Sequence, residues 1–436
     1  MRQVIGIRRE DKNRWERRAP LVPADIKRLV REQGFEFIVQ PSPIRIYRDE
    51  QFAGAGCELN PDLSRAGVIF AIKEIPLDLL EQDKTYVFFA HVIKGQEHNM
   101  PLLQRLLELN CTLIDYERIV DEKNRRLVFF GRQAGQAGMI ETLHALDRRL
   151  RWEGFDSPFQ GVKPAYNYPD LAHAKSALQE MGLSVRAGLD PDLCPLVIGF
   201  AGYGNVSQGA QEVFDLFPHE EIAPEDLAQL GTRKPTREKL FKVVFKEEHL
   251  VVPIDAGEDF ALADYYQNPE RYRSRFADYL PQLTALVNCI YWTPRYPRLV
   301  TRAVARRLWS AGERSLRVIG DISCDIGGSI EFTYKATEPD QASFVYDPIA
   351  DTYKDGVEGR GIAVMAVDNL PCELPRDASD YFSATLRAFA PSLAAADFSR
   401  PFAELGLPPE LMRAVIAHRG ALTQEYRYLE DFLPDV

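Results

Sequence analysis

The apolar residues of this chain fall into short runs that alternate with segments of helical periodicity. In the N-terminal part, the runs predict strands at residues 4–7, 35–39, 68–72, 86–90, 112–114 and 127–130. Helices are predicted at 100–109 and at 23–31, where a proline opens the segment and Ile26, Leu29 and Val30 share one face. This alternation indicates an α/β domain with a mainly parallel sheet.

One apolar run, Leu196–Phe200, leads directly into Gly202-Tyr-Gly204 and then into a helical pattern with apolar positions 210, 213, 214 and 217. A buried strand, a glycine turn and a helix in this order place backbone N–H groups where a pyrophosphate can bind. Glycine is needed there because a Cβ would hold the backbone away from the phosphate. Ser207 occupies the position of the third glycine of the usual dinucleotide fingerprint, so an ordinary strand–helix turn is the alternative.

The remaining periodicity predicts further strands at 242–245, 285–290 and 316–322, and helices at 139–150, 171–181, 378–389 and 409–417. The glycine turn therefore lies in a second α/β domain. We expect a substrate-binding domain of residues 1–135 plus 370–436 and a dinucleotide-binding domain of residues 136–369. The prediction is of two Rossmann-like domains of the α/β class, doubly wound with mainly parallel sheets, and an active-site cleft between them.

Composition narrows the range of partners. The chain has 53 basic and 64 acidic residues among 436, a net charge of −11, which argues against nucleic-acid or membrane partners but allows a small anionic substrate. The six cysteines are scattered without a Cys-x-x-Cys pair, so we expect reduced thiols and no metal site. Without an apolar run near 18 residues or the apolar core of a signal peptide, the expected location is cytoplasmic.

Polar side chains follow several predicted strands of the first domain at the point where each strand ends. Lys73 and Glu74 follow the third strand, His91 the fourth and Glu117 the fifth, and Arg18 lies beyond the first. The carboxyl ends of parallel strands share one edge, so these groups predict an acid–base pocket with an anion-binding arginine. Taken singly, each also fits a solvated strand end, a surface histidine or a salt-bridge partner.

Eight motifs, in order along the whole chain, resemble the lysine–ketoglutarate reductase family, also called lysine-forming saccharopine dehydrogenase, which is related to the alanine dehydrogenases. They are residues 16–23 (ERRAPLVP), 72–76 (IKEIP), 89–96 (FAHVIKGQ), 130–135 (FGRQAG), 202–210 (GYGNVSQGA), 288–292 (NCIYW), 321–331 (DISCDIGGSIE) and 367–371 (VDNLP). The resemblance is to the reductase half of the bifunctional animal and plant enzyme.

The resemblance implies a role for each residue of the predicted pocket. Lys73 would be the general base for the substrate amine, and His91 the acid–base group for carbinolamine and imine chemistry, which suits groups that exchange protons near neutral pH. A lysine beside other cations in a closed site is shifted towards that range. Glu74 and Glu117 would tune these two groups. Arg18 would bind a substrate carboxylate, and Arg126 is a weaker candidate for a second such role; we therefore assign Arg18, Glu74, Glu117 and Arg126 to substrate binding.

The cofactor residues follow from the same resemblance and from the glycine turn. Residues Gly202, Gly204, Asn205 and Val206 would form the phosphate turn, and Asp368 would lie near the nicotinamide. Ser323 and Asp325 lie on a strand end facing the same cleft and equally fit turn residues. Glu225, about twenty residues after the glycines, would favour a free ribose hydroxyl and hence NAD. Arg233 and Lys234 could instead meet a 2′-phosphate, and overall similarity leans slightly to NADP.

The predicted function is an NAD(P)-dependent oxidoreductase that joins lysine to 2-oxoglutarate and reduces the imine to saccharopine, or runs the reverse reaction. The alternatives are reductive amination of another keto acid, as in alanine or opine dehydrogenases, and a sensor that binds the dinucleotide without catalysis. Lys73, His91 and Arg18 argue against a sensor, which would not need them. The expected partners are small molecules, and a homo-oligomer is compatible with the sequence.

Overall fold

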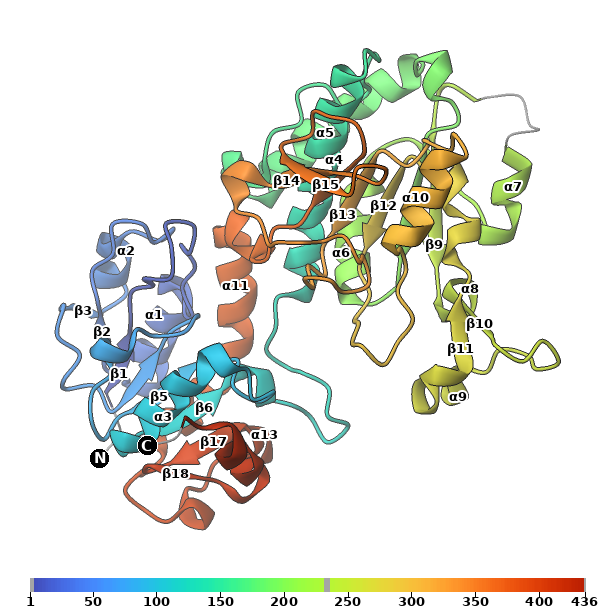
Figure 1. Ribbon diagram of the computed structural model, residues 1–436. Coiled ribbons are helices and arrows are strands. Elements are labelled where there is room, and N and C mark those ends of the chain that lie inside the picture. The colour runs from blue at the N-terminus through green and yellow to red at the C-terminus, as the bar shows by residue number, and fades with distance from the viewer. Residues whose placement is uncertain (1–3, 231–235, 435–436) are drawn as a thin grey trace. The chain divides into compact units, whose positions relative to one another are not determined.

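The computed structural model describes residues 4–230 and 236–434 and divides the chain into two compact units. Unit 1 consists of Met1–Phe130 and Pro375–Val436, and unit 2 of Gly131–Leu374. The predicted boundaries, 1–135 with 370–436 and 136–369, lie close to these. In Figure 1 the blue-to-cyan start of the chain and its red end belong to unit 1.

The described part of unit 1 holds one eight-stranded sheet, in the order β18-β17-β6-β5-β4-β1-β2-β3. Its parallel strands are β1 (Ile5–Ile7), β2 (Phe37–Val39), β3 (Glu58–Leu59), β4 (Val68–Phe70), β5 (Thr85–Phe88) and β6 (Thr112–Asp115). Strands β17 (Val415–His418) and β18 (Ala421–Leu422) extend it in antiparallel fashion beyond β6 (Figure 1). The residues of β1, β2, β4, β5 and β6 are buried, as is typical of parallel strands inside an α/β domain, whereas both residues of the edge strand β3 are exposed.

The helices of unit 1 are α1 (Pro23–Gln33), α2 (Asp49–Gly54), α3 (Met100–Glu108), α11 (Pro375–Leu386), α12 (Ala390–Ala395) and α13 (Pro409–Ala414). Helix α1 shows why the sequence prediction succeeded. Pro23 is its first residue, Ile26 and Leu29 are buried, and Gly34 ends it with a φ of 68° that favours glycine. The helix therefore begins at the proline and ends just before the glycine that mark its two ends in the sequence.

Two predictions for unit 1 are wrong. Residues 127–130 form no strand, because β17 pairs with the edge of β6 and the segment packs through its side chains instead, with Phe130 stacked on Phe382 at 4.7 Å. The helix predicted at 409–417 ends at Ala414, and Val415 begins β17. In both places a pairing distant in sequence decides the structure.

The described part of unit 2 holds a second eight-stranded sheet, in the order β15-β14-β16-β13-β12-β7-β9-β8. Strands β7 (Val197–Ala201), β8 (His219–Glu221), β9 (Leu240–Phe245), β12 (Ala285–Asn288), β13 (Val318–Asp321) and β16 (Ile362–Met365) are parallel. Strands β14 (Ser343–Asp347) and β15 (Thr352–Asp355) are antiparallel. A separate hairpin pairs β10 (Val251–Pro253) with β11 (Tyr272–Ser274).

Helices cover both faces of this sheet, as a doubly wound domain requires. Alternate residues of β7 show the two faces: Ile198 and Phe200 belong to one apolar core, and Val197 and Ala201 to the other. The first core also contains residues of α4 (Gly131–Trp152), α5 (Leu171–Ala187) and α6 (Asn205–Phe214), and the second contains residues of α7 (Leu227–Leu230), α8 (Glu247–Leu250), α9 (Leu262–Gln267) and α10 (Arg302–Ser310). The α/β class with mainly parallel sheets is thus confirmed.

Candidate active site

The functional side chains predicted for unit 1 follow neighbouring parallel strands and therefore meet at one edge of the sheet. Lys73 and Glu74 come after β4, His91 after β5 and Glu117 after β6. The parallel register of β4, β5 and β6 brings the three strand ends side by side. The structure thus brings together the groups that the sequence scattered over 45 positions from 73 to 117.

The His91 ring lies between two carboxylates. Its Nε2 is 3.7 Å from Oε1 of Glu74, and its Nδ1 is 3.7 Å from Oε2 of Glu117. The ring stacks on Phe89, with 6.0 Å between ring centroids and an interplanar angle of 13°. The backbone of His91 has a φ of 52°, which is uncommon outside glycine, and its carbonyl accepts a hydrogen bond of 2.9 Å from Nδ2 of Asn99. The histidine is therefore held in place by both its backbone and its ring.

A cation lies on the outer side of each carboxylate. Lys12 Nζ is 3.2 Å from Oε2 of Glu74, and Arg126 is 2.9 Å from Oε1 of Glu117. Burial alone would raise the pKa of Glu117, but its contact with His91 and the charge of Arg126 lower it to about 2. Burial opposes ionisation of Glu74 as well, yet Lys12, His91 and Lys73 lower its pKa. Both carboxylates therefore stay ionised on either side of the histidine.

The surroundings of Lys73 favour the loss of its ammonium proton. Burial lowers the pKa of its ammonium, and the charges of Arg18 and Lys12 lower it further, against the opposing effect of Glu74 and Glu16. The physical argument made from the sequence, that a lysine beside other cations is shifted towards neutrality, is consistent with this arrangement. The catalytic role of Lys73 stays a prediction.

A buried carboxylate that the sequence analysis missed fixes the end of β4. Glu10 accepts hydrogen bonds from the backbone N–H groups of Ile72, at 2.7 Å, and Lys73, at 3.0 Å. Burial and the charge of Glu16 raise the pKa of Glu10 to about 7. The available signal was the polar run of residues 8–12 directly after the first buried strand, which also contains Lys12.

Arg18 forms an ion pair with Glu16 inside the protein. Its Nε donates to Oε1 of Glu16 at 2.7 Å and its terminal nitrogen to Oε2, while its guanidinium lies 4.4 Å from the centre of the Phe130 ring. The side chains of Arg18 and Glu16 are only 1% and 0% exposed. The structure therefore shows Arg18 as a buried salt-bridge partner, and its binding of a substrate carboxylate stays a prediction.

In unit 2, β7 ends in the glycine turn and α6 begins directly after it. Gly202 has a φ of 95°, which a residue with a Cβ rarely adopts. Gly204 precedes the first residue of α6, Asn205, and no atom lies within 4 Å of the position that a Cβ on Gly204 would take. Together with the N–H groups of Asn205 and Val206, this open space fits the close approach of a phosphate. The turn therefore suits a dinucleotide, and the contacts of Gly202, Gly204, Asn205 and Val206 with it stay a prediction.

Two other glycines allow α6 to pack closely against α4. A Cβ on Gly135 would lie 1.9 Å from the carbonyl oxygen of Val206, and one on Gly209 would lie 2.1 Å from that of Arg132. Ser207, at the position of the third fingerprint glycine, is buried and accepts a hydrogen bond of 2.9 Å from Gln211. The close approach of α6 to α4 depends instead on Gly135 and Gly209.

The remaining predicted cofactor residues lie at or beyond the same edge of the sheet. Asp368 follows β16, and Ser323 and Asp325 follow β13, where Ser323 donates a hydrogen bond to the carbonyl of Ile290. Glu225 lies beyond β8, 67% exposed, with its Oε1 3.3 Å from Nε2 of His249. Arg233 and Lys234 lie outside the described residues. These cofactor assignments stay predictions.

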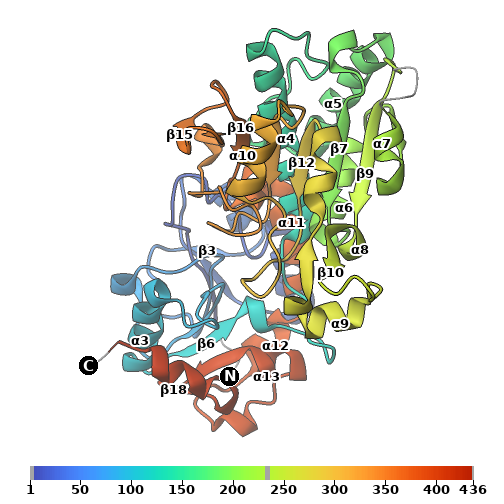
Figure 2. The same ribbon diagram turned by 45° about the vertical axis from the view of Figure 1, so that its right-hand side comes forward.

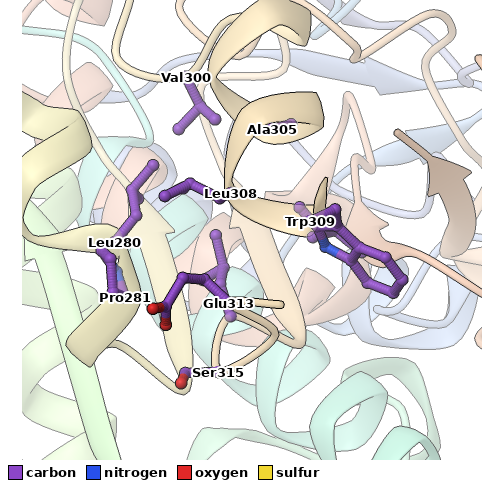
Figure 3. Close-up of a pocket in the computed structure, with 10 residues that line it drawn as sticks. Leu280, Pro281, Val300, Ala305, Leu308, Trp309, Glu313 and Ser315 are labelled. Carbon is purple, nitrogen blue, oxygen red and sulfur yellow. The ribbon is translucent and has the colours of Figure 1, made fainter. Parts of the chain in front are cut away.

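A small apolar hollow elsewhere in unit 2 is lined by residues that include Leu280, Leu308, Trp309 and Leu316 (Figure 3). Leu316 shortly precedes β13, and Ile362, also in the lining, begins β16. The hollow therefore lies at the amino ends of the strands, the edge opposite to the glycine turn. Within the described ranges, no helix has the length and apolar character to cross a bilayer, and no group of three or more His, Cys, Asp or Glu is placed to hold a metal ion.

Comparison with known proteins identifies two domain models. The N-terminal domain of alanine dehydrogenase/PNT matches residues 6–137, and its C-terminal domain matches residues 273–425. Among solved structures, an L-alanine dehydrogenase superposes with a TM-score of 0.63 at 18% identity, covering 99% of both chains. A transhydrogenase from Sinorhizobium meliloti gives 0.57 at 16% identity, covering 97% of this chain and 100% of its own. These structures show the fold.

Curated relatives are more similar in sequence. The alpha-aminoadipic semialdehyde synthases of Arabidopsis thaliana and Rattus norvegicus are 38% and 39% identical over 98% of this chain, which spans 41% and 47% of their lengths. A saccharopine dehydrogenase [NAD(+), L-lysine-forming] of Neurospora crassa is 28% identical, covering 87% of this chain and 88% of its own. On the two matched domains, the chain belongs to the alanine dehydrogenase/PNT family.

Proposed function

We propose that this chain is an oxidoreductase that interconverts lysine plus 2-oxoglutarate and saccharopine with a nicotinamide dinucleotide. The observation that carries the proposal is the His91 ring between Glu74 and Glu117 at one edge of the unit 1 sheet, where the half-buried Lys73 directly precedes Glu74. The similarity to enzymes named saccharopine dehydrogenase and alpha-aminoadipic semialdehyde synthase supports the same reaction. The matched alanine dehydrogenase/PNT domains support the dinucleotide.

The reaction requires several proton transfers. The ε-amine of lysine must lose a proton before it attacks the keto carbon, and the resulting carbinolamine loses its hydroxyl as water to give an imine. The dinucleotide supplies the hydride that reduces this imine, and one further proton completes the secondary amine. Lys73, whose ammonium pKa is lowered by burial and by the charge of Arg18, takes the proton of the substrate amine. His91 donates and accepts the protons of the carbinolamine steps, with Glu74 and Glu117 next to its two ring nitrogens.

Unit 2 holds the dinucleotide at the glycine turn. Gly202, Gly204 and the first N–H groups of α6 bind the pyrophosphate, because the backbone is open there and the helix N-terminus favours an anion. Asp368 follows the parallel strand β16 at the same sheet edge and is proposed near the nicotinamide. The sequence leans slightly towards NADP, and this cofactor preference is part of the proposal. The assay measures it by comparing NADP with NAD.

A substrate assay tests the proposal. Purified protein with NADPH or NADH should oxidise the cofactor when lysine and 2-oxoglutarate are both present, and should reduce NADP or NAD when given saccharopine. Matched reactions replace 2-oxoglutarate by pyruvate, or lysine by ammonia. Turnover only with ammonia or only with pyruvate would assign the chain to another reductive amination. Binding of the dinucleotide without turnover on any pair would contradict an enzymatic role.

A further inference from the structure

The order of strands around the glycine turn differs from the order along the chain. Strand β8 comes next after β7 in sequence, but it lies at the sheet edge and pairs only with β9 among the described strands. Strand β9 pairs directly with β7, with Ala201 opposite Phe245 (Figure 2). The N–H of Gly202 donates a hydrogen bond of 2.9 Å to the carbonyl of Phe245, so the turn is tied to the end of β9.

This order changes where the adenosine ribose of a dinucleotide is expected. In a dinucleotide domain, an acidic side chain at the carboxyl end of the strand beside the glycine-turn strand meets the 2′-hydroxyl of that ribose. The usual spacing of about twenty residues holds because the next strand in sequence is also the neighbour in space. Here the two strands differ, so the spacing that indicated Glu225 refers to β8. Glu225 pairs with His249 of α8 (Glu247–Leu250) and is 67% exposed.

The carboxyl end of β9 carries a carboxylate next to the glycine turn. Glu247 follows Phe245 by two residues and begins α8. Tyr266 donates a hydrogen bond of 2.7 Å to its Oε1. The charge of Glu247 raises the pKa of the phenol of Tyr203, the middle residue of the glycine turn. Glu247 is thus held by Tyr266 at the end of the strand that pairs with the glycine-turn strand.

We propose that the carboxylate of Glu247, rather than Glu225, faces the 2′-position of the adenosine ribose and favours NAD over NADP. This inference rests on the proposed dinucleotide function. The carboxylate accepts a hydrogen bond from a free 2′-hydroxyl, and it repels the two negative charges of a 2′-phosphate. Glu247 is therefore a specificity residue of the cofactor site, whichever cofactor the rest of that site prefers.

Direct binding measurements on the full chain test this role without turnover. The probes are 5′-AMP and adenosine 2′,5′-bisphosphate, which differ only by the 2′-phosphate, titrated by calorimetry into the native protein and into Glu247→Gln and Glu225→Gln. Glu247→Gln should raise the affinity for the bisphosphate relative to 5′-AMP by about tenfold, since one repulsive charge is removed. Glu225→Gln is the matched control and should leave the ratio unchanged. Glu247→Asp keeps the charge and should leave the ratio near that of the native protein.

The outcomes separate this inference from the function on which it rests. A ratio that moves in Glu225→Gln and not in Glu247→Gln would overturn the inference, and so would no change in either variant. In both cases, tight binding of 5′-AMP that is lost in Gly204→Val would leave the dinucleotide function intact. Absence of binding by both probes and by NADH and NADPH to the folded native protein would instead contradict the proposed function itself.

Discussion

Two glycines of the same turn-and-helix segment, Gly204 before α6 and Gly209 within it, should differ in their response to substitution by alanine. One substitution should weaken dinucleotide binding and the other should lower stability. Gly204 has an extended backbone, with φ −75° and ψ −170°, and open space where a Cβ would project. Gly209 faces α4, and a Cβ there would lie 2.1 Å from the carbonyl oxygen of Arg132. Gly204→Ala therefore fits the fold but fills the space proposed for the pyrophosphate. Gly209→Ala leaves that space open and forces α6 away from α4.

The magnitudes follow from these contacts. Gly204→Ala changes only the residue that caps α6, a loss of about 0.5–1 kcal/mol of unfolding free energy, while dinucleotide affinity should fall at least about tenfold. At Gly209 the backbone must move by about 1 Å to relieve the clash, and overpacking of this kind costs about 1–3 kcal/mol or more. Urea unfolding and NADH and NADPH titrations, both on the same purified variants, measure the two effects.

The comparison of the two variants is the control. If Gly204→Ala binds the dinucleotides as tightly as the native protein, the open space at the turn is not where the pyrophosphate lies. If Gly209→Ala unfolds at the same urea concentration as the native protein, the close packing of α4 on α6 does not support this segment. Either result would refute the roles assigned to these glycines.

Two further predictions concern buried charges. Burial raises the pKa of both Glu141 and Glu373, which contact each other, and that of Glu141 reaches about 7 from 4.5. Stability should therefore be fully present below about pH 4.5 and fall by about 3 kcal/mol as the pH rises through 7. Urea unfolding at pH 5 to 8 should show this fall flattened in Glu141→Gln, which removes the titrating carboxyl group, and an equal fall would contradict it. Arg18→Met should cost about 3–5 kcal/mol because the buried carboxylate of Glu16 loses the positive charge of Arg18, and adding Glu16→Gln should restore most of it. If Arg18 also binds a substrate carboxylate, the folded double variant should show a KM raised about 30-fold or more, and an unchanged KM would make Arg18 purely structural.

The sequence predicted those parts of the fold whose determinants are local. The run Leu196–Phe200 and the glycines after it predicted β7, its turn and α6, because apolar run, turn residues and helical periodicity are contiguous. The strand ends carrying Lys73 and His91 were likewise found, since polar residues directly follow buried strands. Parallel pairing then explains why these groups share one edge without any information beyond strand order.

Features set by pairing between distant segments were missed. The antiparallel strand β17 takes the edge of β6 from about 300 positions away, which is why residues 127–130 are not a strand and residues 415–417 are not helical. Strand β9 lies between β7 and β8 in the sheet although it follows both in sequence. The spacing along the chain that indicated Glu225 could not reveal this order. The ion pair between Arg18 and Glu16 is local, but its burial depends on Phe130 and on the fold around it.

The proposed reaction of lysine with 2-oxoglutarate depends above all on proton transfer by Lys73 and His91. The most direct measurement is the turnover of Lys73→Met, His91→Gln and the double variant with lysine, 2-oxoglutarate and the reduced dinucleotide. Lys27→Met and His98→Gln, at exposed positions of unit 1, are matched controls. Each single variant should lose about 10²–10⁴-fold in turnover and one limb of the pH profile, with dinucleotide affinity unchanged because both residues lie in unit 1. The double variant should be little slower than the worse single one, as expected for groups that act together. Losses that multiply in the double variant would mean independent roles, and turnover near the native value in Lys73→Met would contradict the account.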